Sequence, residues 1–219
     1  MHQCFFAVFH ETNVAPTLLE GLQRLDMQYG DFKEIGIATL MEGRVQSQNT
    51  YSLQLLQKQL PEQPLSGHFG MAYTCSKSPE DVEKPYSAHL CANERFAIAY
   101  HGVIENRQPE WLDIDTQTDG EIFLTTLDHY LEIDGISPFS AMTLTIKHLQ
   151  GCFAVMALFA KEDFLIVAHR DCQVAISVNE DLTELSWDTN ALIRLSRRVT
   201  LLKKKSLTVL YSVKGRCVN

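Results

Sequence analysis

The feature that most constrains the fold of this chain is a series of short apolar segments in its last third. Several of these segments are almost entirely apolar, and short spacers separate each from the next. Such segments are typical of strands, and a close succession of them indicates one sheet packed on another. The six segments are Cys152–Phe159, Phe164–His169, Val174–Val178, Leu185–Asp188, Val199–Leu201 and Ser206–Tyr211.

Three amphipathic segments are expected to form helices that cover the outer faces of these sheets. Residues 14–25 carry leucines at helical spacing, and Thr12 or Asn13 is the candidate cap. Residues 118–131 open with the Thr-x-x-Glu pattern of a capping box, and residues 137–149 open with Ser-Pro. The apolar positions expected to face inward in the third helix are Phe139, Met142, Ile146 and Leu149.

Earlier in the chain, four shorter segments also have the composition of strands, and residues 51–60 are expected to form a short helix. The four segments are Phe5–Phe9, Ile35–Leu40, Gly70–Thr74 and Phe96–Tyr100. Residues 75–93 form a polar loop that is long for a compact domain, and such loops are often functional. Strands and helices do not alternate along the chain. We therefore expect a layered α+β sandwich in one domain, residues 1–219, rather than a doubly wound parallel sheet.

Charge and hydropathy exclude several classes of function. The formal net charge is −8 at pH 7, whereas nucleic-acid binding needs a surplus of Lys and Arg. No stretch approaches the ~18 to 20 apolar residues of a membrane span, and no basic-then-apolar leader is present. We expect a cytoplasmic protein that binds neither nucleic acid nor membranes, and we predict no cofactor.

The six cysteines include no Cys-x-x-Cys pair and are expected to be reduced thiols. Cys152 and Cys172 begin apolar segments, where a cysteine usually behaves as a small buried hydrophobic residue. Cys75, His89 and Cys91 match no common spacing of zinc ligands. The sequence therefore predicts no metal site.

Five stretches resemble one known family, in the same order and at matching spacing across nearly the whole chain. They are LLEGLQRL at 18–25, GMAYT at 70–74, YHGVIEN at 100–106, TQTDGEI at 116–122 and LQGCFAV at 149–155. These stretches are similar to segments of the glutaminase domain of class II glutamine amidotransferases, which are N-terminal-nucleophile hydrolases. The resemblance implies a four-layer αββα sandwich, with two mainly antiparallel sheets between helical layers.

The resemblance also implies roles for individual residues in the hydrolysis of glutamine to glutamate and ammonia. Cys4, at the start of the first strand, matches the family's nucleophile. Gly102 matches the glycine whose backbone N–H serves the oxyanion hole. Asp119 matches the carboxylate that holds the α-amino group of glutamine, and His89 falls where the family has a histidine beside the pocket.

Two matching positions carry a different residue. Cys75 stands where the family has the arginine that clamps the α-carboxylate, and His101 stands where it has the asparagine of the oxyanion hole. Loss of a charged partner typically costs ~2 to 5 kcal/mol, whereas an imidazole can donate in place of asparagine. Three residues also precede Cys4. The α-amino group, which is the family's base, would then lie roughly 10 Å away in an extended chain.

We therefore expect a diverged glutaminase-type domain that hydrolyses glutamine weakly or not at all, unless trimming exposes Cys4 or His101 acts as its base. Any transfer of the ammonia would need a separate synthase subunit. The alternative is a non-catalytic module that binds an amino acid-like ligand or a partner protein. In that alternative Cys4 is an ordinary strand cysteine, and Asp119 serves the first turn of its helix. Residues 169–171 are expected to form a solvated loop.

Overall fold

The computed structural model describes residues 3–30, 32, 34–75, 90–92, 95–106, 118–162, 164–171, 174–178, 182–186, 199–201, 206–213 and 216–218. The predictions made above for His89 and Cys172 concern residues outside these ranges. Within them, each strand and helix expected from the sequence is present, with ends shifted by a few residues.

The first sheet has seven strands in the order β11-β9-β10-β1-β4-β2-β3, and neighbouring strands pair antiparallel. Its strands are β1 (Gln3–His10), β2 (Glu34–Met41), β3 (Arg44–Thr50), β4 (Phe69–Cys75), β9 (Ala175–Val178), β10 (Leu182–Ser186) and β11 (Val199–Leu201). The strand that carries Cys4, β1, is therefore central in its sheet, with β10 on one side and β4 on the other.

The second sheet has six strands in the order β13-β12-β8-β7-β6-β5, again antiparallel. Its strands are β5 (Leu90–Ala92), β6 (Phe96–Ile104), β7 (Gly151–Phe159), β8 (Phe164–Arg170), β12 (Ser206–Val213) and β13 (Arg216–Val218). The sequence did not predict β13, and it placed the residues of β5 within the expected loop over residues 75–93.

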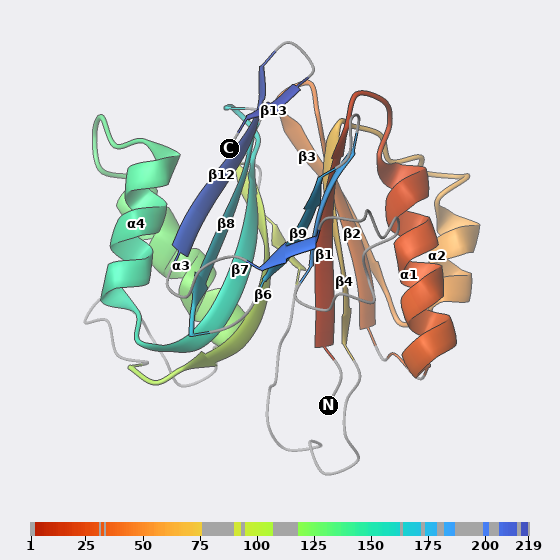
Figure 1. The fold of residues 1–219 in the computed structure, drawn as a ribbon, viewed down its shortest axis with the longest axis horizontal. Helices are drawn as coiled ribbons and strands as arrows, with labels where there is room; N and C mark the ends of the chain where they lie inside the picture. The colour runs from red at the N-terminus through yellow and green to blue at the C-terminus, as the bar shows by residue number, and fades with distance from the viewer. Residues whose placement is uncertain are drawn as a thin grey trace.

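Helices cover the outer face of each sheet (Figure 1). The helices are α1 (Ala15–Tyr29), α2 (Leu53–Gln59), α3 (Asp119–Leu131) and α4 (Pro138–His148). The first two lie on the sheet that contains β1, and the other two lie on the sheet that contains β6. The expected α+β sandwich, with two antiparallel sheets between helical layers, is therefore confirmed.

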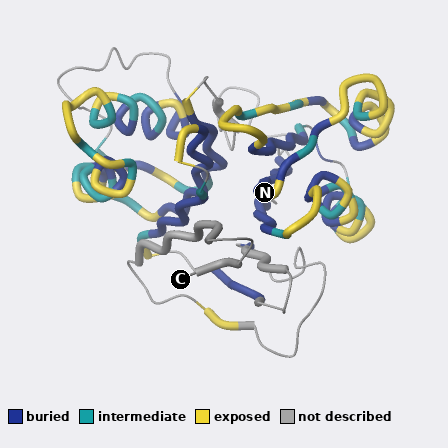
Figure 2. Tube along the Cα trace, turned by 90° about the horizontal axis from the view of Figure 1, so that it is seen from above, coloured by how far each residue is buried: buried dark blue, intermediate teal, exposed yellow. Residues whose placement is uncertain are grey.

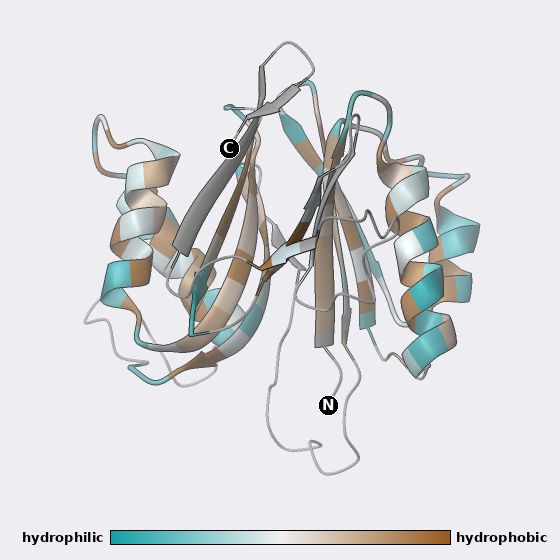
Figure 3. Cartoon of the chain, in the orientation of Figure 1, coloured by the Kyte–Doolittle hydropathy of each residue, from teal (hydrophilic) through white to brown (hydrophobic). Residues whose placement is uncertain are grey.

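Three apolar layers hold the sandwich together. One fills the space between the sheets, one lies between the first sheet and α1 and α2, and one lies between the second sheet and α3 and α4. The strands are mostly hydrophobic, whereas the outer surfaces of the helices are polar and exposed (Figures 2 and 3). Side chains alternate between the faces of a strand, so each central strand contributes to two of these layers.

Two local predictions were wrong. The N-cap of α1 is Val14, which offers no side-chain acceptor, although the Oδ1 of Asn13 accepts a hydrogen bond from the backbone N–H of Ala15 at 3.1 Å. In α4 the predicted inward residue Phe139, in the first turn of the helix, is half exposed, whereas Met142 is fully buried as expected.

Candidate functional site

Cys4 lies on the side of the first sheet that faces the helices. Phe5, Ala7 and Phe9 belong to the core between the sheets, whereas Cys4, Phe6 and Val8 belong to the core beneath α1 and α2. The thiol lies 3.9 Å from the hydroxyl of Ser186 and is only 4% exposed.

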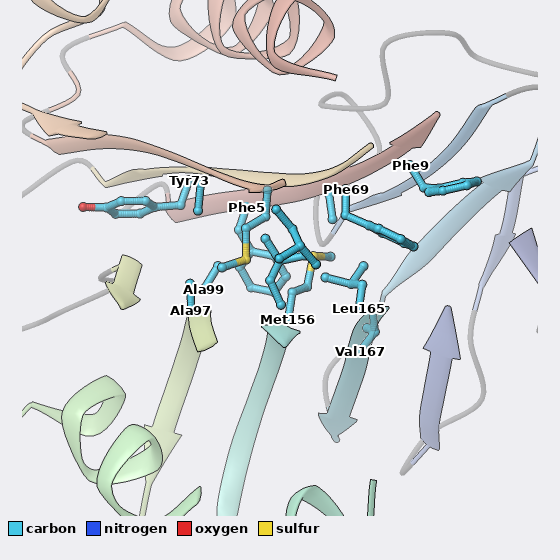
Figure 4. Close-up of a cluster of buried hydrophobic side chains, with 14 of the residues drawn as sticks. Phe5, Phe9, Phe69, Tyr73, Ala97, Ala99, Met156, Leu165 and Val167 are labelled. Atoms are coloured by element: carbon cyan, nitrogen blue, oxygen red, sulfur yellow. The ribbon is translucent and has the colours of Figure 1, made fainter. Parts of the chain in front are cut away.

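The opposite face of β1 meets the second sheet. Gln3 pairs with Cys75 at the end of β4, and Cys75 belongs to the core between the sheets. Phe5 projects into the same space (Figure 4), and its ring centroid lies 6.5 Å from that of His101 in β6. Cys75 and His101 therefore lie on facing sheets at one end of the sandwich, whereas the Cys4 thiol is directed into a different layer.

His101 is held in its neutral form at neutral pH. Burial lowers the pKa of its imidazole from 6.5 to about 4, because desolvation disfavours the charged ring. A neutral imidazole offers one N–H donor and one nitrogen acceptor. His101 is therefore suited to donate a hydrogen bond to a carbonyl oxygen, whereas its lowered pKa makes it a weak base for a thiol.

Gly102 is required by the packing of β6 against β7. Its φ is +132°, and a Cβ at this position would lie 2.2 Å from the backbone oxygen of Cys152 and 2.5 Å from the Cα of Phe153. Close packing against β7 therefore requires a glycine at this position, whether or not its backbone N–H serves an oxyanion hole.

Asp119 is the first residue of α3 and is buried at the helix N-terminus. Its Oδ2 accepts a hydrogen bond from the backbone N–H of Ile104 at 3.2 Å, which ties α3 to the end of β6. The preceding Thr118 forms the predicted capping box with Glu121. The carboxylate therefore interacts with both the start of α3 and the end of β6. Its partner Ile104 comes three residues after His101 in β6.

Two side chains at this end of the second sheet are exposed to solvent. Val103 and Cys152 pair in register across β6 and β7, and both side chains are exposed; Val103 is 54% exposed. Both continue the strand positions that face the first sheet, since Ala154 belongs to the core between the sheets. The expectation that Cys152 is buried was wrong: its side chain is exposed, whereas that of Phe153, on the opposite face of β7, is fully buried.

His169 is a second residue that the sequence placed wrongly. It was expected both to end the predicted strand Phe164–His169 and to begin a solvated loop over residues 169–171; it belongs to β8 and is fully buried, so only the loop was wrong. Leu165 and Val167 face the first sheet, so alternation places His169 on the same face.

Nothing in the described part of the chain suggests a metal site or a membrane span. Its His, Cys, Asp and Glu residues form no group of three or more that could hold a metal ion. Its helices include none that is long and apolar enough to cross a membrane.

Comparisons with known proteins agree with this architecture. No family model matches the chain. The sequence is 26% identical over 209 residues to a glutamine–fructose-6-phosphate aminotransferase of Neisseria meningitidis serogroup A, covering 91% of this chain and 34% of that protein. It is 31% identical over 206 residues to the protein of the same name from Bartonella quintana, covering 90% and 33%. The fold matches the glutamine phosphoribosylpyrophosphate amidotransferase of B. subtilis with a TM-score of 0.68 and 14% identity, covering 95% of this chain and 47% of that one.

The sheets, the helical layers and the sequence similarity together define a glutaminase-like domain of class II glutamine amidotransferases, and this chain belongs to that family. Its curated relatives are glutamine–fructose-6-phosphate aminotransferases, and the chain spans about a third of their length.

Proposed function

We propose that residues 1–219 form one glutaminase-type domain that binds glutamine or a related amino acid at the open end of the sandwich, and that it hydrolyses glutamine weakly or not at all. One observation carries the second half of this proposal. The thiol of Cys4 packs in the layer beneath α1, whereas His101 faces the space between the sheets. A nucleophile and its base must lie within hydrogen-bond reach of each other, and this arrangement separates them.

The substrate contacts support weak binding. In the proposed site Asp119 holds the α-amino group of the ligand, and His101 donates a hydrogen bond to its side-chain carbonyl. The backbone N–H of Gly102 lies beside that position, and His89 would complete the rim. Cys75 supplies no positive charge for the α-carboxylate, because a thiol replaces the guanidinium that the family resemblance leads us to expect. We therefore expect a dissociation constant no tighter than about 1 mM, equivalent to roughly −4 kcal/mol.

The test measures ammonia release and glutamine binding on the purified protein. We expect ammonia release close to the uncatalysed background, and no change in that rate on Cys4→Ala. Binding should tighten on Cys75→Arg, which restores the cation, and should not tighten on Cys75→Met, which adds bulk alone. Rapid ammonia release that Cys4→Ala abolishes would refute the proposal. Tight glutamine binding unaffected by Asp119→Asn would show that the site lies elsewhere.

A partner follows from the relatives' names. They are aminotransferases, and the chain covers only about a third of each. If the domain does release ammonia, a synthase unit outside residues 1–219 would have to receive it. If it does not, the same surface would act as a ligand-binding module, and glutamine would change the protein's stability without being consumed. Intact mass after incubation of a shortened protein that begins at Cys4 separates the two, because only an active thiol forms a covalent adduct with a glutamine-like electrophile.

A further inference from the structure

A cavity opens where the first residue of β6 meets the last residue of β7, at the end of these strands away from His101. Its volume is about 340 Å³, which is within the usual range for small-molecule sites. Phe96 pairs with Phe159 at this end, whereas His101 pairs with Ala154 further along β6. At about 3.3 Å per residue, the Phe96 and His101 positions lie roughly 17 Å apart, so the cavity is separate from the proposed glutamine site.

The inner wall of this cavity is apolar. The rings of Phe96 and Phe159 stack with their centroids 5.7 Å apart, and both side chains are buried in the layer beneath α3 and α4. Leu131, the last residue of α3, and Ile136 line the cavity and pack against the same layer. Pro138, the first residue of α4, completes the wall. The hydrocarbon part of a ligand would therefore extend an apolar layer that is already packed.

Apolar side chains also remain exposed on the connection between α3 and α4. Ile133 is 48% exposed and Phe139 is 46% exposed. Both lie within three residues of Ile136, whose backbone N–H donates a hydrogen bond to the carbonyl of Ile133 at 3.2 Å. Apolar groups that gather on a surface are typical of binding sites. Two other cavities in the described part of the chain lack this character, because charged or amide side chains form most of their walls.

Three charged residues line the cavity, and two of them are positive. Arg95 forms an ion pair with Asp128 of α3. Lys161 and Glu162 are exposed in the turn between β7 and β8. The two cations favour one negative charge on a ligand, whereas Glu162 disfavours a second one. The wall and the charges together suit a molecule with an apolar body and a single carboxylate.

We propose that this cavity binds a small apolar monocarboxylate, with its hydrocarbon part against Phe96 and Phe159 and its carboxylate beside Lys161. Each CH₂ group that is buried raises the affinity about fourfold. An exposed ion pair raises it by at most about fivefold. The hydrocarbon part therefore supplies most of the affinity, and Lys161 selects the sign of the charge. The proposal goes beyond the glutaminase-type function and does not depend on it.

The experiment titrates the whole folded protein with straight-chain carboxylates by calorimetry. We expect octanoate to bind at one site with a dissociation constant of about 1 mM or tighter, which its roughly ten non-hydrogen atoms are able to supply. The affinity should fall about fourfold for each CH₂ group removed, as measured with hexanoate and butanoate. Octanol and octylammonium have the same hydrocarbon chain without the negative charge, and both should bind more weakly than octanoate.

Substitutions then locate the site. Lys161→Met removes the charge and keeps a side chain of similar length, so it should weaken octanoate binding by up to about fivefold and leave octanol binding unchanged. Lys58→Met, which removes a lysine from α2 on the outer side of the other sheet, is the matched control and should change neither. Ile136→Trp should weaken octanoate and octanol alike by at least about tenfold, because the larger ring occupies the apolar space.

Several results would overturn the proposal. They are no binding of octanoate, equal affinities for butanoate and octanoate, tighter binding of octylammonium than of octanoate, and equal effects of Lys161→Met and Lys58→Met. If Ile136→Trp does not fold, the chain-length series and the two lysine variants still decide the matter. His101→Asn distinguishes this cavity from the glutamine site. Octanoate should bind that variant as it binds the parent protein, and a loss of affinity would mean that octanoate occupies the glutamine site instead.

Discussion

Gly102 illustrates at the residue scale how a family position can be retained for the fold. Its φ of +132° lies in a region that other residues rarely adopt, and β7 approaches its Cα so closely that a side chain has no room. Two residues later in β6, the backbone N–H of Ile104 donates a hydrogen bond to the Asp119 carboxylate. A substitution of Gly102 is therefore expected to disturb packing and stability, whatever its effect on ligand binding.

We expect Gly102→Ala to destabilise the protein by more than about 3 kcal/mol, because backbone strain and a contact of 2.2 Å with the oxygen of Cys152 add together. Gly135→Ala is the matched control. Gly135 also has a positive φ, +74°, but nothing lies within 4 Å of its added Cβ, so only the strain of about 1 to 2 kcal/mol remains. Urea unfolding of both variants measures the difference, and equal losses would show that β7 yields to the new methyl group.

At the scale of an element, the N-terminus of α3 combines a helix cap with a hydrogen bond to the neighbouring strand. The Thr118 hydroxyl accepts a hydrogen bond from the backbone N–H of Glu121, and the Glu121 carboxylate accepts one from the backbone N–H of Thr118. Asp119 follows the cap directly and binds the N–H of Ile104. The cap therefore fixes the direction of the carboxylate as well as the start of the helix.

We expect Thr118→Ala to cost about 1 kcal/mol in the free energy of unfolding, the usual value for loss of a helix cap. Ser137→Ala, which removes the cap of α4, should cost a similar amount. Only the first change should also accelerate hydrogen exchange at the Ile104 amide, because only that cap orients Asp119. Equal exchange at Ile104 in the two variants would show that Asp119 keeps its position without the capping box.

The whole molecule depends on the apolar layer between its two sheets, where Met156 of β7 packs among side chains from both sheets (Figure 4). We expect Met156→Ala to destabilise the protein by about 2 to 5 kcal/mol, because the cavity it leaves lies between two rigid sheets. Met27→Ala, at a residue that is 80% exposed in α1, should change stability by less than about 0.5 kcal/mol. Thermal unfolding by circular dichroism checks both, and a small loss at Met156 would mean that the sheets close over the gap.

The sequence by itself determined the class of fold and the order of its elements. Apolar runs separated by short spacers indicated stacked sheets, the Thr-x-x-Glu pattern located α3, and five stretches in register indicated the family, because these signals are local and survive without knowledge of the neighbours.

Only the tertiary structure decided which side chains share a site. A shift of one residue along a strand moves a side chain to the other face, so the sequence could not tell that Cys4 faces α1 while Cys75 faces the second sheet. Exposure was equally inaccessible, because Cys152 and His169 both stand at the ends of apolar segments, yet Cys152 is exposed and His169 is fully buried. Register and burial arise from pairing between strands far apart in the chain, and these pairings, rather than residue types, placed His101, His169 and Cys152 on one face.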